Sequence, residues 1–175
     1  MKKRLLIAFG MLSILGAGAA LTNKAHAGIY SYNIPFDKIQ EKVDQHIPYA
    51  KAGLVLHSLQ VSGGENVMTA DVDGNYDMLV IHHKFQARST FGMTYHDGSF
   101  YLTNFHVVNA IIDGKPVALS EHQNAQVSLE HALNHMAQNM PVYTLKNDSL
   151  KGAAIKATLE SIAVHSDHIT AELGL

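Results

Sequence analysis

The chain has 175 residues, a formal net charge of −2 and no cysteine. The lack of cysteine excludes disulfides, thiolate nucleophiles, cysteine-based metal sites and a lipid-modified cysteine. Lys and Arg cluster only within the first residues, and this argues against nucleic acid or an anionic membrane as a partner.

The first 27 residues have the three parts of a secretory signal peptide. Lys2, Lys3 and Arg4 form a basic start, residues 5–21 are almost entirely apolar, and residues 25–27 read Ala-His-Ala, a typical cleavage site. Removal of the leader's four basic residues leaves nine of the 13 basic and all 15 acidic residues, a net charge of −6. We therefore expect a periplasmic protein without a lipid anchor, with one domain over residues 28–175. The alternative is a leader that stays uncleaved as a membrane anchor.

The next segments predict one helix followed by several strands. Pro35 is suited to open an amphipathic helix, with the apolar side chains of Phe36, Ile39, Val43 and Ile47 on one side. From Leu54 the period changes to two, and residues 54–61, 68–78 and 85–95 are expected to be strands. Asp97-Gly98 is typical of a tight hairpin turn. In the next strand the apolar parity switches near Thr103-Asn104, which predicts a bulge there.

A helix is predicted over residues 120–140, with Ser120 as its cap and Pro141 at its end. Its apolar residues recur at the spacing of one helical face: Leu129, Ala132, Leu133, Met136, Ala137 and Met140. At about 1.5 Å per residue the helix would be about 30 Å long. We therefore expect an α+β domain in which a strongly curved antiparallel sheet wraps around one long helix. A short helix over residues 149–158 and a hairpin over 159–173 are expected to close the chain.

The order of these elements resembles the YceB-like family of bacterial envelope proteins. The resemblance rests on GSFYLTNFHVVNAIIDGKPVALSE, on the long helix that ends at Asn139-Met140-Pro141, and on the P-x-Y-x-L of Pro141, Tyr143 and Leu145. It implies a fold similar to the tubular lipid-binding modules (TULIP or BPI-like), with an apolar groove between helix and sheet. The typical family member is a lipoprotein of unassigned function, whereas this chain has no cysteine to acylate.

Histidines give the only metal hypothesis in the sequence. His131 and His135 are four residues apart on the predicted helix, a spacing at which two imidazoles can share an ion. Ala132 stands where the H-E-x-x-H motif has its glutamate, and both histidines project away from the apolar stripe. The simpler interpretation is a polar helix surface. His82-His83 is weaker still, because neighbours in a strand point to opposite faces.

No catalytic motif is present: G-x-S-x-G, a phosphate-binding glycine loop and a dinucleotide fingerprint are all missing. We therefore expect neither an enzyme nor a cofactor. Methionines and aromatic residues on the predicted inward faces indicate a surface that adapts to apolar ligands, although such stripes are more often simply core. The groove candidates are Met68, Tyr76, Phe85, Phe91, Met93, Leu129, Leu133, Met136 and Met140.

The functional expectation is a protein that binds a lipid or other apolar molecule between the long helix and the sheet. The alternative is an envelope scaffold or partner-binding module with a closed core and no ligand. The protein partner, if there is one, is not indicated by any motif in the sequence.

Overall fold

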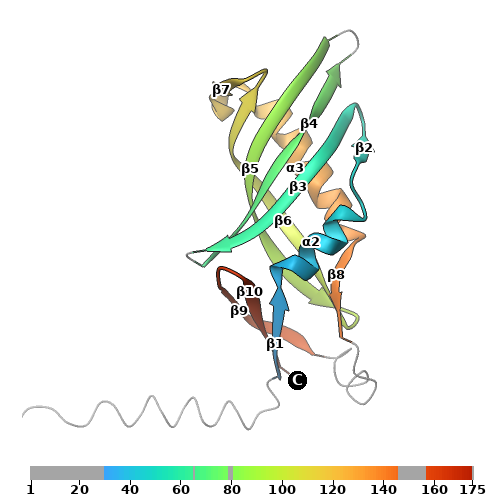
Figure 1. Cartoon of the computed structure of the whole chain (residues 1–175), viewed down its shortest axis with the longest axis vertical. Coiled ribbons are helices and arrows are strands. Elements are labelled where there is room, and N and C mark those ends of the chain that lie inside the picture. The colour runs from blue at the N-terminus through green and yellow to red at the C-terminus, as the bar shows by residue number, and fades with distance from the viewer. Residues whose placement is uncertain (1–29, 65, 79–80, 146–156, 175) are drawn as a thin grey trace, which may run out of the picture.

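The computed structural model describes residues 30–64, 66–78, 81–145 and 157–174. Ten strands, two α-helices and one 3-10 turn fall within this part of the chain. Four long antiparallel strands dominate it: β3 (Leu54–Gly64), β4 (Val67–Met78), β5 (Ile81–His96) and β6 (Ser99–Ile112). Figure 1 shows them as long, twisted strands that cross the molecule, with α3 (Gln123–Gln138) against one side.

Shorter strands extend this sheet at both edges. β2 (Tyr49–Lys51) pairs with β3, while β7 (Lys115–Val117) and β8 (Pro141–Thr144) pair with the two ends of β6. A separate small sheet has the order β1-β10-β9. It joins the start of the described chain to its end through three strands: β1 (Tyr30–Pro35), β9 (Thr158–Val164) and β10 (His168–Gly174).

The fold-class prediction was wrong. Over the described residues the protein is mostly β, with 63% strand and only two short α-helices, and its strands form a curled half-barrel rather than a sheet wrapped around one long helix. Strand length explains the difference. β5 has 16 residues and spans about 50 Å at about 3.3 Å per residue, whereas the 16 residues of α3 span about 24 Å at 1.5 Å each. A helix of that length covers only part of such a sheet.

The helix α3 begins later than its sequence predicts. Residues Leu119–Glu121 form the 3-10 turn η1, and α3 starts at Gln123 after His122, without a side-chain cap. Ser120 is therefore not the cap. The apolar face is correctly predicted: Leu129, Ala132, Leu133, Met136 and Ala137 are all buried.

Two local predictions on β6 and its turns are confirmed. Asp97 and Gly98 both have positive φ, as a two-residue hairpin between right-twisted strands requires. Asn104 also has a positive φ of 53°, and the β5–β6 register shifts between Thr90 and Gly92. Phe100 and Leu102 are buried before this bulge and Phe105 and Val107 after it, so the inward face switches as expected.

The first helix, α2 (Phe36–Asp44), connects the small sheet to the large one. Its residues Phe36, Ile39 and Val43 are buried. A Cβ at Gly63 of β3 would collide with the ring of Phe36 and would lie 2.6 Å from the carbonyl oxygen of His165. Glycine at this position therefore allows β3 to approach both α2 and the β9–β10 turn closely.

Three parts of the sequence-based interpretation lie outside the described residues. The predicted signal peptide over residues 1–27 is one, and nearly all of the predicted helix over 149–158 is another. The side chain of Met78, on the predicted inward face of β4, is the third. Among the helices that the structure describes, none has the length and apolar character needed to cross a membrane.

Candidate functional site: an apolar cavity beneath the start of α3

A cavity of about 250 Å³ lies between the large sheet and the segment that runs from β7 through η1 into α3. Most of its lining is aliphatic or aromatic: Leu54, Phe85, Val107, Ala110, Ile112, Val117, Leu119, Ala125 and Leu129. Four further lining residues carry polar groups: Tyr76, His83, His122 and Gln126. A lining of this kind favours apolar guests, because it offers water few hydrogen-bond partners and an apolar guest buries its surface against it.

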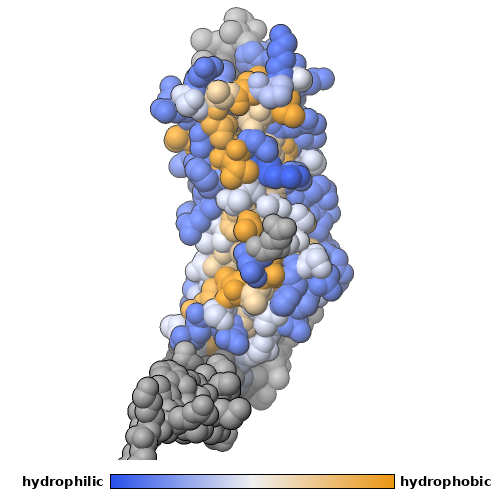
Figure 2. All heavy atoms as spheres, turned by 90° about the vertical axis from the view of Figure 1, so that its left-hand side faces the viewer, coloured by the Kyte–Doolittle hydropathy of each residue, from blue (hydrophilic) through white to orange (hydrophobic). Residues whose placement is uncertain are grey.

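The same region carries apolar side chains at the surface. Figure 2 views the molecule from the side on which β7 lies in Figure 1, and hydrophobic side chains gather in the upper half of this face with hydrophilic ones around them. Several lining residues are only partly buried, among them Ile112, Val117 and Leu119. The cavity is therefore a cleft that a ligand can reach from solvent, not a sealed void.

The end of β6, β7, η1 and the start of α3 all contribute residues to the cavity lining. The hairpin turn at Asp113-Gly114 has positive φ at both residues and sends β7 back along β6. The chain then passes through η1 and returns as α3. Leu129 of the helix is almost fully buried, and Ala125, one turn earlier, leaves space that a larger side chain would fill.

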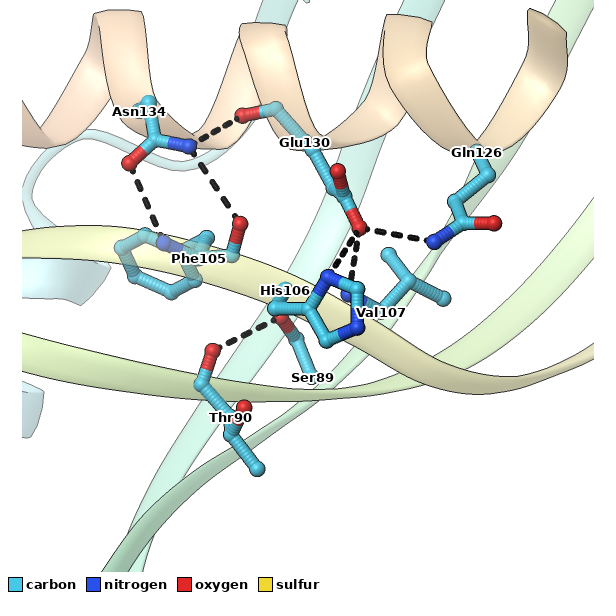
Figure 3. Close-up of polar contacts among 8 residues, drawn as sticks. All are labelled: Ser89, Thr90, Phe105, His106, Val107, Gln126, Glu130 and Asn134. Carbon is cyan, nitrogen blue, oxygen red and sulfur yellow. Dashed lines mark hydrogen bonds and ion pairs between the residues drawn. The ribbon is translucent and has the colours of Figure 1, made fainter. Parts of the chain in front are cut away.

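Hydrogen bonds from two side chains hold α3 against β6 next to the cavity (Figure 3). The amide of Asn134 accepts from the N–H of Phe105 (3.1 Å) and donates to the carbonyl oxygen of the same residue (3.4 Å). The carboxylate of Glu130 accepts from the N–H of Val107 (2.9 Å). One edge of β6 pairs with β7 at one end and with β8 at the other. Between these two short strands, the side chains of Asn134 and Glu130 supply hydrogen-bond partners for the backbone of β6.

The same Glu130 oxygen has two more partners. Gln126 donates to it from Nε2 (3.0 Å), and Nδ1 of His106 lies 2.9 Å away as an ion-pair partner when that ring is protonated. Glu130 thus links two residues of β6 to the first turns of α3. Gln126, which belongs both to this network and to the cavity lining, connects the anchoring of the helix to the shape of the cavity.

His83, at the mouth of the cavity, is fixed by an acidic residue. Its Nδ1 donates to Oδ2 of Asp113 (2.6 Å), and the backbone N–H of Lys84 donates to Oδ1 of Asp113 (3.0 Å). The hydrogen bond from His83, followed by that from Lys84, lowers the pKa of Asp113. With Nδ1 committed to Asp113, the other ring nitrogen of His83 is the one left to face a ligand.

The sequence-predicted groove residues divide into two sets. Tyr76, Phe85 and Leu129 line the cavity. The others are buried in the core outside the cavity lining: Met68, Phe91, Met93, Leu133, Met136 and Met140. Phe91, for instance, stacks on Phe105 with ring centroids 5.2 Å apart.

The sequence did not predict three polar lining residues, His83, His122 and Gln126. It also did not predict the part of the lining that comes from β7 and η1, namely Val117 and Leu119. The sequence pattern gives His83 no role beyond that of one of two neighbouring histidines in a strand, and it predicts a helix only from Ser120. The one signal that could have indicated these two lining residues of β7 and η1 is that Val117 and Leu119 are large, apolar and two positions apart, with only the small Ala118 between them.

The predicted metal pair has a different setting. The rings of His131 and His135 lie 6.5 Å apart on α3, and Nδ1 of His135 is 3.0 Å from the hydroxyl of Tyr49 on β2. Both histidines are exposed. Within the described ranges, no group of three or more His, Cys, Asp or Glu side chains is arranged to hold a metal ion.

The fold and this site define a mostly β protein whose half-barrel and short helix enclose an apolar, solvent-accessible cavity. A search of curated proteins found no match to the chain. A family model matches residues 37–168, which include every element from α2 to the beginning of β10. The chain belongs to the DUF1439 family, a family of proteins of unknown function.

Proposed function

We propose that this protein binds an apolar ligand with a single aliphatic chain in the cavity beneath the start of α3. The observation that carries the proposal is an accessible cavity with nine apolar lining residues. A scaffold with a closed core, the alternative function, has no need of such a space. Binding rather than catalysis is proposed, since the polar groups at the cavity mouth include no nucleophile with an adjacent base.

The cavity volume limits the ligand. Ligand pockets for drug-sized molecules span about 300–1,000 Å³. At about 30 Å³ for a water-sized group, 250 Å³ accommodates about eight methylene groups. Each buried methylene contributes about 0.8 kcal/mol, so eight of them supply about 6 kcal/mol, less than the roughly 8 kcal/mol that micromolar binding requires. After the cost of association, we therefore expect weak binding by the aliphatic chain alone, with a Kd in the millimolar range.

The place of action is part of the same proposal. The basic start, the apolar run and the Ala-His-Ala site of residues 1–27 support export to the periplasm. We also propose that the DUF1439 chain is related to the YceB-like envelope proteins, whose resemblance to tubular lipid-binding modules agrees with an apolar ligand. The support for this relationship remains the segment around β6 and α3 and the Pro141–Leu145 string.

Titration with a series of straight-chain 1-alkanols tests the proposed function. Isothermal titration calorimetry should show the association constant rising about fourfold per added carbon, the equivalent of one buried methylene. The rise should level off at about eight carbons, where the cavity is full. No binding of any alkanol, or a rise that continues without a break to the longest soluble chain, would contradict the proposal.

A further inference from the structure

The apolar cavity adjoins a second, polar hollow. This hollow, of about 400 Å³, lies over η1 and the first residues of α3, and its lining includes Ser120, Glu121, Gln123 and Asn124. It shares three lining residues with the apolar cavity: Tyr76, His122 and Ala125. A ligand that fills the cavity and extends past these three residues therefore enters polar surroundings.

The residues at this boundary include several whose side chains can donate hydrogen bonds. His122 and Tyr76 belong to the lining of both spaces, and Gln123 and Asn124 line the hollow. Glu121 is the one carboxylate in its lining, while the nearby Asp113 already accepts hydrogen bonds from His83 and Lys84. Because Tyr76, His122, Gln123 and Asn124 can each donate, this boundary can provide several hydrogen bonds to a carboxylate head group, which accepts without donating.

The apolar cavity and the polar hollow also determine which way round an amphiphilic ligand binds. The lining of the first is overwhelmingly apolar, and burying a charged head group there without partners would be strongly unfavourable. The side chains of the second are polar and exposed to solvent, so a head group placed there keeps part of its hydration. The chain of an amphiphile belongs in the cavity and its head in the hollow.

From this juxtaposition we infer that the ligand is a single-chain carboxylate of about eight to ten carbons, with its chain in the apolar cavity and its carboxylate beside His122 in the polar hollow. The inference rests on the proposed function, because it assigns the ligand class of the same cavity. It adds the orientation of the ligand in the site, and it names His122 as the residue that discriminates between head groups.

The test compares three ligands of equal chain length on the full chain: decanoate, 1-decanol and decyltrimethylammonium. Calorimetry at about pH 6 should show decanoate binding about tenfold more tightly than 1-decanol, with decyltrimethylammonium the weakest. Equal affinity for decanoate and 1-decanol would overturn the inference and leave the proposed function standing. Failure of all three ligands would remove both.

A matched pair of variants separates the role of His122 from a general effect of charge. His122→Leu should reduce the preference for decanoate over 1-decanol to about twofold or less, while 1-decanol still binds. The control is His131→Leu, which removes an exposed histidine from the same helix but outside both spaces. An unchanged preference in His122→Leu, or an equal loss in His131→Leu, would overturn the inference.

Discussion

Filling the cavity with a side chain of the protein itself should abolish ligand binding and leave the fold intact. Ala110 lines the cavity from β6, and an Ala110→Phe substitution places a ring in the space that the aliphatic chain would occupy. We expect the affinity for 1-octanol to fall about a hundredfold, the equivalent of about four methylenes that no longer fit. The melting temperature should stay unchanged or rise, since the ring fills a void rather than an already packed site.

The matched control is Ala50→Phe, which places the same ring on the exposed β2. Ala50→Phe should bind 1-octanol with the same affinity as the unsubstituted protein. If Ala110→Phe fails to fold, Ala125→Leu approaches the same cavity from α3. If folded Ala110→Phe or folded Ala125→Leu binds 1-octanol with undiminished affinity, the alkanol binds outside this cavity.

The second large effect concerns the attachment of α3 to β6. Asn134→Ala removes the acceptor of the Phe105 N–H and a donor to its carbonyl oxygen, and Phe105 is only 3% exposed. Leaving buried backbone groups unpaired costs about 1–3 kcal/mol. In thermal unfolding followed by circular dichroism, each kcal/mol should lower the melting temperature by about 4 °C.

Two further variants test whether the loss of stability comes from the hydrogen bonds between α3 and β6. Asn124→Ala changes an exposed asparagine of the same helix and should alter the melting temperature by no more than about 2 °C. Glu130→Ala in the Asn134→Ala background should add a further loss, because the N–H of Val107 then also lacks its acceptor. If Asn134→Ala were as stable as Asn124→Ala, the contacts of Figure 3 would not hold the helix in place.

Local features of the fold could be predicted from the sequence because their causes are local. The buried face of α3 follows from the spacing of Leu129, Leu133 and Met136, and the β5–β6 hairpin follows from Asp97-Gly98. The bulge near Asn104 could be located because the apolar residues of β6 change parity there. Each of these signals lies within about ten residues of the structure that it specifies.

Features that depend on distant pairing could not be predicted. The pairing of β1 with β10 joins the two ends of the described chain, and no property of residues 30–35 indicates this partner. The fold class was wrong for a related reason. The apolar stripe of the helix is the same whether a sheet wraps it or it covers one part of a longer half-barrel, and the extent of β3 to β6 decides between these arrangements.

The candidate site was only partly predictable. Tyr76, Phe85 and Leu129 were named because they are large and apolar, and by size alone they do not differ from the fully buried Leu133 and Met140. Whether an apolar residue lines a cavity or fills the core depends on what packs against it. Here the small side chains of Ala110 and Ala125 leave the space open, and small residues give no signal of this kind in a single sequence.

The most direct test is photoaffinity labelling of the purified protein with a medium-chain carboxylate that carries a diazirine at the end of its chain, followed by peptide mass spectrometry. The account predicts crosslinks to cavity residues on β6, β7 and the first turns of α3, which excess decanoate should suppress. Crosslinks confined to the exposed face of the sheet, or spread over the surface and insensitive to the competitor, would contradict it.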